Sequence, residues 1–580
     1  MPWLRLAALI LSEVGYYWLL LPRMQRCREG IPFLVICAQT LILFFAGMVE
    51  CLAPAALILW AGGVAGLIYR LIPRFRAPFQ VPVSLWALAG LTVYGCLLTK
   101  GKVFTFCDNF YHWASICKVM ITTDAYPLAD SIVTFTSYPP GTACWIYYVC
   151  RVVTGQSVCE WGMMMAQAVL ISSAVVPLLA LGRARLQKLA AVLGFGLIML
   201  DLLTGAVPWT DLMPDAVLPA ITIGMMALTV LLLQRSSSGK TPAPWILLPP
   251  LMLLMLVKNS GIFFALWGMA VWFALARPKG KEAWLHLLLM VLCMGVWLLW
   301  RYYISARIPG AMKSKHSLGR DAILNNFAMT TGEHILDIAH LYWNAVKQQL
   351  ALHCTALLPL ALLIPLRRRL KGGAKALPWL SAGFWLLWHV GLLAVYTVFM
   401  HFSEGLALGG FSRYELSLRP ALTAMLTLTL VMTDTEGFAP IFRALSAAAL
   451  CVGCAALVLL MKPEYSRLIP GPQQGAERRA RMEALCAQCE TGPDKSYIVV
   501  ARDPDKTAGD DPMAKYLLNT RNVLLADSFL DGPGWLTPEW YEEYATTCDY
   551  ILFMEERPEA TDWVAAHLPE AVGQEVVRVK

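Results

Sequence analysis

Residues 107–120 read CDNFYHWASICKVM. The stretch follows a long apolar segment, at 81–98, and sets Asp108, His112 and Trp113 among aromatic and apolar neighbours. On a helix, Asp108 and His112 are four residues apart and share one face. A carboxylate placed in this way can act as a general base or bind a divalent cation such as Mg²⁺ or Mn²⁺. It can equally cap a short helix, because Asp is a favoured N-cap residue.

The rest of the chain has the composition of a polytopic membrane protein. Of its 580 residues, 58% are hydrophobic and only 15% are charged, whereas soluble domains carry about 25% charged residues. The formal charge of +8 comes from Lys and Arg in short clusters between apolar segments. Such clusters indicate orientation in a membrane and do not point to nucleic acid. The 16 Cys are scattered, many of them in apolar segments, and imply no disulfide framework.

Apolar segments long enough to cross a bilayer, which takes about 20 residues, recur along residues 1–461. The stretch 245–276 is broken near Lys258 into halves too short to span, so we expect a hairpin of two short helices with Lys258 at its tip. Residues 140–154 are expected to form an interfacial helix along the outer surface. These segments predict an all-α polytopic membrane protein with a helical bundle of about 12 to 14 transmembrane segments. The single segments are 3–22, 31–49, 51–69, 81–98, 160–181, 189–206, 214–233, 284–302, 349–366, 376–400, 416–432 and 443–461.

Orientation follows from the basic clusters, which belong on the cytoplasmic side of a plasma membrane. The remaining loops and the C-terminal part then face outward, including the first outward loop at 99–159. The basic clusters lie at 23–28, 70–76, 183–188, 277–281 and 367–375, and the other outward segments are 207–213, 258–261, 303–348 and 401–415.

The composition changes abruptly near residue 462. Short apolar runs at 496–501, 522–526 and 550–554 alternate with helix-like stretches, a pattern that predicts strands and helices of a small domain. No glycine-rich phosphate-binding loop occurs there. We therefore expect residues 462–580 to form a small α/β accessory domain on the extracytoplasmic side.

Two motifs follow one another in the first outward loop. Asp108, His112 and Trp113 give the pattern D-x-x-x-H-W, and Y-P-P-G runs from Tyr138 to Gly141 just before an amphipathic helix. Both fall in a loop too rich in aromatic residues to be a solvated linker. Ionisable groups in a segment that packs against the membrane are candidates for function.

Three more polar motifs lie in later outward segments. The stretch PWTDLMPDAV carries Asp211 and Asp215, VKNSG carries Lys258, and FSRYELSLRP carries Arg413 and Tyr414. Each motif is short, and their order along the chain is what makes the set specific.

In this order, over about residues 81–432, the motifs resemble those of the GT-C superfamily, which includes bacterial mannosyl- and aminoarabinose transferases. The resemblance implies an inverting enzyme that acts on the outer face of the lipid bilayer and transfers a sugar from a polyprenyl-phosphate donor to an envelope glycan, lipid or protein. It implies Asp108 as general base, with His112 beside it. Arg413, Lys258, Arg301 and His316 are the implied ligands of the donor phosphate, and Trp113, Asp124, Tyr138, Asp211, Asp215 and Tyr414 the implied substrate-binding residues.

Structural interpretations stand beside these roles. Asp211 or Asp215 can cap the helix that begins near 214. Lys258 can extend from a short helix to the lipid headgroups, Arg301 can anchor the end of a span, and Trp113 can pack at the interface.

Two other functions fit the composition. A transporter or flippase of a lipid-linked precursor would be expected to show an internal repeat and ionisable groups near mid-span, whereas the polar residues here gather on the outward side. An oligosaccharide polymerase or ligase would use a diphosphate-linked donor and a large late outward loop, for which the segment 303–348 is a candidate.

Overall fold

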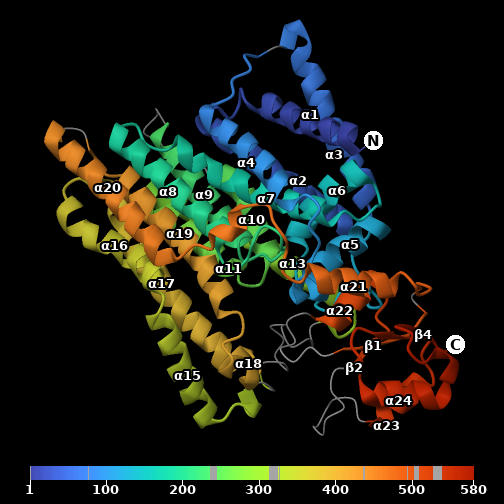
Figure 1. Ribbon diagram of the computed structural model, residues 1–580. Coiled ribbons are helices and arrows are strands. Elements are labelled where there is room, and N and C mark those ends of the chain that lie inside the picture. The colour runs from blue at the N-terminus through green and yellow to red at the C-terminus, as the bar shows by residue number, and fades with distance from the viewer. Residues whose placement is uncertain are drawn as a thin grey trace.

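The computed structural model of the protein describes residues 2–75, 77–235, 244–311, 324, 327–435, 438–492, 494–501, 509–526 and 538–580. Helices follow one another from Pro2 to Met461, and Figure 1 shows them as a bundle with the C-terminal segment at its lower end. The α-helices are α1 (Pro2–Leu20), α2 (Ile31–Met48), α3 (Leu52–Leu71), α4 (Val83–Thr99), α5 (Ala114–Thr123), α6 (Gly141–Thr154), α7 (Glu160–Val175), α8 (Arg185–Thr204), α9 (Val217–Gln234), α10 (Leu248–Val257), α11 (Gly261–Ala276), α12 (Gly280–Met294), α13 (Val296–Arg307), α15 (Gly332–Lys347), α16 (Leu350–Leu366), α17 (Leu377–Ala394), α18 (Phe402–Leu406), α19 (Phe411–Val431), α20 (Pro440–Met461), α21 (Ala476–Cys486), α22 (Asp510–Leu518), α23 (Pro538–Ala545) and α24 (Pro558–His567). Short 3₁₀ or π turns are η1 (Gln25–Gly30), η2 (Pro73–Phe75), η3 (Asn109–Trp113), η4 (Val176–Ala180), η5 (Pro244–Leu247), η7 (Gly372–Ala376), η8 (Val395–Phe399), η9 (Tyr465–Leu468) and η10 (Pro569–Ala571).

The apolar segments form helices where the sequence predicted them, and the all-α polytopic fold class is confirmed. Within the described residues, eight helices are long and apolar enough to cross a membrane, or up to nine if the bent pair α15 and α16 counts as one span. This is fewer than the expected 12 to 14. The difference arises because α4, α10 and α11 are helical but shorter than a full span. Helix α1, with Arg5 and Glu13, and helix α19, with Arg413, Glu415 and Arg419, are also not among the candidate spans.

Burial varies from helix to helix in a way that follows the residue pattern. Helix α9 is apolar on all sides, and every residue from Val217 to Leu232 is buried, as expected of a central helix. It packs against α7, α11 and α19. Helix α20 is the opposite case: only 11% of its apolar window is buried, so its side chains are left to face lipid.

One helix is enclosed by other helices more fully than the sequence predicted. The expected interfacial helix is α6, and its residues Gly141–Cys150 are all buried, packed between α1, α2, α5 and α7. An amphipathic pattern fits a membrane surface and a crowded bundle equally well, so the interfacial position stays a prediction. Gly141 permits the tight fit, since a Cβ there would come within 2.5 Å of the Leu256 carbonyl oxygen at the end of α10.

The expected hairpin is confirmed as α10 and α11, which pack against each other. Lys258 has an extended backbone between them, and the Gly261 amide donates to its carbonyl oxygen at 2.8 Å. Gly261 is required by the close approach of the two helices, because a Cβ would come within 1.9 Å of the Leu254 carbonyl oxygen.

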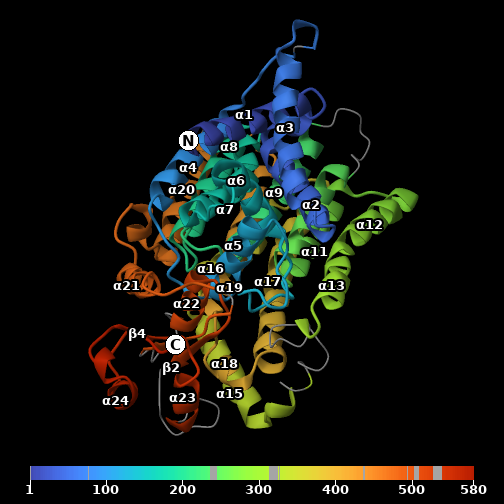
Figure 2. The same ribbon diagram turned by 90° about the vertical axis from the view of Figure 1, so that its right-hand side faces the viewer.

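The C-terminal part contains a small sheet, as its apolar runs predicted. The strand order is β2-β1-β3-β4, with β1 parallel to β2 and β3, and β4 antiparallel at the edge. Tyr497 and Tyr516 belong to the same buried core as the helical bundle. The C-terminal part therefore packs against the bundle and is not merely linked to it by the chain. Figure 2 shows it at the end of the bundle where α15 and α18 also lie. The strands are β1 (Tyr497–Val500), β2 (Val523–Ala526), β3 (Tyr550–Phe553) and β4 (Val576–Arg578).

Candidate active site

The stretch at residues 107–120 contacts the start of α19 through Asp108. Asp108 precedes η3, but its carboxylate makes no capping hydrogen bond; instead it forms an ion pair with the Arg413 guanidinium from the first turn of α19. Arg413 also contacts the Met213 sulfur at 2.8 Å and lies over the Phe106 ring. The side chains of Asp108 and Arg413 are 31% and 23% exposed, so both are within reach of a ligand.

A second ion pair lies beside the first. The Lys258 ammonium is 3.3 Å from an Asp215 carboxylate oxygen, which also accepts a hydrogen bond from the Ser417 hydroxyl at 3.4 Å. The same ammonium lies over the Tyr414 ring, 5.2 Å from its centre. Lys258 therefore points into protein and does not extend to headgroups. Asp215 does not cap α9, whose N-cap residue is Ala216.

Electrostatics at Lys258 keep it charged. Burial alone would lower the pKa of its ammonium group, but the Asp215 carboxylate and the Tyr414 and Tyr138 hydroxyls outweigh that effect and raise the pKa above its ordinary value. The pKa of Tyr138 is also raised, chiefly by burial, with contributions from Tyr414, Asp108 and Asp215. These influences place Tyr138 beside both ion pairs.

A hydrogen bond between Asn109 and Asp211 joins the loop that carries Asp108 to the loop that precedes α9. The buried Asn109 amide donates to an Asp211 carboxylate oxygen at 2.8 Å, and its own oxygen accepts from the Leu212 backbone at 3.0 Å. Gln167 of α7 donates to the Asp211 carbonyl oxygen at 2.9 Å. Burial raises the pKa of Asp211 to about 6. Asp211 is thus a buried tie between loops and not an exposed ligand.

His112 and Trp113 lie in a buried aromatic cluster. Trp113 stacks on Tyr138 with ring centres 5.5 Å apart, and His112 packs edge-on against both rings. Neither ring nitrogen of His112 has a hydrogen-bond partner in the part of the chain that the structure describes. Burial lowers the pKa of His112 to about 3, so the ring is neutral near pH 7. This setting favours packing over proton transfer.

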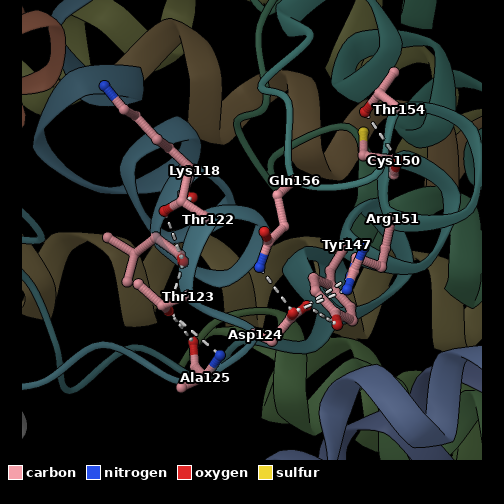
Figure 3. A network of polar contacts seen from close by, with 11 residues as sticks. Lys118, Thr122, Thr123, Asp124, Ala125, Tyr147, Cys150, Arg151, Thr154 and Gln156 are labelled. Carbon is pink, nitrogen blue, oxygen red and sulfur yellow. Dashed lines mark hydrogen bonds and ion pairs between the residues drawn. The ribbon is translucent and has the colours of Figure 1, made fainter.

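Asp124 belongs to a different network, shown in Figure 3. Its carboxylate is 2.8 Å from Arg151 and accepts hydrogen bonds from Tyr147 at 2.6 Å and Gln156 at 3.1 Å. No contact between described residues joins it to Asp108 or to either cation of the site. Its partners on and after α6 account for its charge without a substrate.

Of the other two candidate phosphate ligands, the structure describes only Arg301. The Arg301 guanidinium lies over the ring of Trp297 in its own helix, 4.6 Å from the ring centre, as an anchoring residue would. His316 falls outside the described residues.

A divalent cation would need several oxygen or nitrogen ligands in one place. Among the described residues no group of three or more His, Cys, Asp and Glu side chains is arranged to hold a metal ion. The carboxylates closest to the site already face cations, Asp108 facing Arg413 and Asp215 facing Lys258. The side chains that the structure describes at this site therefore do not fit a metal centre.

Two solved structures resemble this chain along most of its length. One is the crystal structure of ArnT from Cupriavidus metallidurans bound to undecaprenyl phosphate, which covers 84% of this chain and 96% of its own, at 13% identity and a TM-score of 0.48. The other is the same protein in the apo state, with 83% and 94% covered, 14% identity and a TM-score of 0.48. No family model matches the sequence, and no curated protein does. Similarity at this level does not fix a family.

Several residues of the site were missed by sequence reasoning. Asn109, Met213 and Ser417 hold Asp211, Arg413 and Asp215 in place. Asn109 carried a usable signal, because a buried amide next to Asp108 in an aromatic stretch needs partners. Met213 and Ser417 carried none.

Proposed function

We propose that the protein is a membrane glycosyltransferase of GT-C type, which transfers a sugar from a polyprenyl-phosphate donor to an envelope acceptor with inversion. The observation that carries the proposal is the pairing of Asp108 with Arg413 beside that of Lys258 with Asp215. Two carboxylates and two fixed cations from four distant segments meet at one place. Leaving-group phosphate needs such cations, and an acceptor hydroxyl needs such a base.

In the resting protein the Asp108 carboxylate is occupied by Arg413. A donor phosphate offers the guanidinium a better match, since Arg binds phosphate oxygens through two parallel hydrogen bonds. When the phosphate takes Arg413, the carboxylate is released to act as the base. Donor binding would thus switch on the catalytic group, and water would not meet an activated base beforehand.

The reaction then follows as one displacement. Asp108 takes the proton of the acceptor hydroxyl as its oxygen attacks the anomeric carbon, and the bond from that carbon to the phosphate oxygen breaks. The polyprenyl phosphate leaves carrying the bonding electron pair, stabilised by Arg413 and Lys258. Because no covalent enzyme intermediate forms, the anomeric configuration inverts. Tyr138 and Tyr414 would border the sugar.

The basic clusters support an orientation in which this chemistry would take place on the outer face of the plasma membrane. The C-terminal domain would then also be extracytoplasmic, with its boundary near residue 462. Labelling an engineered cysteine near residue 124 with an impermeant reagent tests the orientation. Labelling that requires a broken membrane would contradict it.

The decisive experiment separates donor binding from transfer. With purified protein, Asp108→Asn should bind undecaprenyl phosphate at least as tightly as the wild type, because the competing carboxylate charge is gone. Sugar transfer, followed in cells by mass spectrometry of envelope glycans, should be lost. Arg413→Ala should weaken binding about tenfold or more, the cost of a charged hydrogen bond.

Asp337→Asn, on the exposed surface of α15, is the matched control and should preserve both binding and transfer. Normal transfer by Asp108→Asn would refute the base assignment. Unchanged donor affinity in Arg413→Ala would remove that residue from the phosphate site.

A further inference from the structure

A polar cavity lies on the other side of α19 from Arg413. It has a volume of about 230 Å³ and is bordered by Ser412, Glu415 and Arg419 of α19, by Asp201 of α8 and by Arg467 after α20. At about 100° per residue, Glu415 is about 200° around the helix from Arg413. The cavity is therefore distinct from the candidate active site.

Glu415 is the unexplained group in this cavity. The residue is only 3% exposed, and neither carboxylate oxygen has a hydrogen-bond partner among the residues that the structure describes. The nearest basic atom is Nδ1 of His389, at 3.9 Å, and this nitrogen already contacts the Tyr342 hydroxyl at 2.8 Å. A buried carboxylate without donors is costly. A ligand that brings N–H groups to Glu415 would remove that cost.

Two cations and two other carboxylates of the cavity are held in ion pairs. Arg419 forms an ion pair with Asp201, and Arg467 forms one with Glu464 while also donating to the Gly205 carbonyl oxygen. With Lys462 included, three cations and three carboxylates line the cavity. Glu415 and Arg419 are one turn apart on the same face of α19, so the unpaired carboxylate has positive charge close to it. This balance fits a zwitterion better than a simple anion.

An apolar groove of about 350 Å³ begins one helical turn away along the same three helices. Leu197, Thr423 and Leu457 line the groove, and each is four residues from a residue that lines the cavity. Four residues correspond to about 6 Å along a helix. The polar cavity and the apolar groove thus follow one another along α8, α19 and α20, beside the lipid-facing side of α20.

We propose that this composite site binds a glycerophospholipid whose head group carries a primary amine. The ammonium group would donate to Glu415, the phosphodiester would contact Arg419 and Arg467, and the acyl chains would lie in the groove. The site is independent of the proposed donor site, because the two lie on different faces of α19.

Native mass spectrometry of the purified full chain with added lipids tests the proposal. The wild type should retain phosphatidylethanolamine over phosphatidylcholine, which has no ammonium N–H, and over phosphatidylglycerol, which has no ammonium. Glu415→Gln should reduce retention of phosphatidylethanolamine about tenfold and abolish the preference. Glu333→Gln, an exposed change on α15, should alter neither.

A second variant tests the apolar groove and leaves the charged residues of the cavity unchanged. Leu457→Trp should fill the groove and reduce retention of all three lipids while Glu415 stays intact. The proposal is overturned if Glu415→Gln retains phosphatidylethanolamine as the wild type does, or if phosphatidylglycerol is preferred. The proposal is also overturned if undecaprenyl phosphate displaces phosphatidylethanolamine equally well from the wild type and from Glu415→Gln, because the groove would then be a polyprenyl site.

Discussion

At the scale of single residues, burial decides which of the titratable groups near the site can carry protons. His112 and Asp211 lie close to the ion pairs, yet both are enclosed by protein. Burial disfavours the charged form of each group, so it lowers the pKa of the imidazole and raises that of the carboxyl. The two residues should therefore change the stability of the folded protein in opposite directions as the pH rises.

His112→Phe should preserve both sugar transfer and its pH profile, because a ring that stays neutral moves no proton. The pKa of His112 is about 3 in the folded protein, against about 6.5 in an unfolded chain. As pH falls through that window only the unfolded state gains the proton, so the wild type loses stability. His112→Phe should lose less, which thermal unfolding at pH 5 and pH 7.5 would reveal. Loss of transfer with a folded variant would instead support a catalytic imidazole.

Asp211→Asn should stabilise the protein at pH 7.5, because the side chain can still accept the Asn109 hydrogen bond. The pKa of Asp211 is about 6 when folded and about 3.9 when unfolded. Between these values the folded state binds more protons, so stability falls as pH rises through the window and the penalty is complete above pH 6. The gain should reach about 3 kcal/mol at pH 7.5 and vanish near pH 4. Thermal unfolding across this range measures it, and a less stable variant at pH 7.5 would contradict the burial penalty.

At the scale of elements, the hairpin of α10 and α11 sets the position of Lys258. Its two helices meet at Gly261, where backbone lies against backbone. An apolar stretch of this length could have been one long helix, and the break supplies the ammonium group that pairs with Asp215.

Gly261→Ala should therefore displace the tip of the hairpin. The added Cβ would lie 1.9 Å from the Leu254 carbonyl oxygen, and overpacking of this kind costs about 1 to 3 kcal/mol. We expect a lower midpoint of thermal unfolding and weaker binding of undecaprenyl phosphate. Gly332→Ala at the start of α15, where a Cβ meets nothing within 4 Å, is the control and should change neither. Unaltered stability and binding in Gly261→Ala would show that the hairpin does not position Lys258.

At the scale of the whole molecule, buried charges dock the C-terminal part on the bundle. Glu160 at the start of α7 accepts from Arg479 of α21 at 2.8 Å and from the Phe104 backbone at 2.6 Å. Lys118, in the stretch that opens the first loop, donates to the Tyr516 carbonyl oxygen. The loop that carries Asp108 is thus held between the bundle and the C-terminal segment.

Glu160→Gln should loosen this docking, because among the described residues it leaves the Arg479 guanidinium, 3% exposed, with the exposed Glu483 as its one remaining ion-pair partner. Removing one member of a buried pair costs about 3 kcal/mol or more. Limited proteolysis near residues 469–475 should be faster than in the wild type. Glu575→Gln, which breaks an exposed pair with Arg481, should have little effect. Equal cleavage rates in Glu160→Gln and wild type would show that other contacts carry the docking.

The sequence by itself determined the helices, the hairpin and the strands, because residue period, apolar length and a break at Lys258 are local properties of the chain. Most predicted segments and observed helices agree to within about six residues at each end, as for 416–432 and Phe411–Val431, whereas the predicted span 284–302 is divided between α12 and α13. Only the tertiary structure decided that α6 is buried and that Asp124 faces Arg151. It also decided that Asp108 meets Arg413, 305 positions away. Such pairs depend on which helix faces pack together, and that choice is made by the whole core.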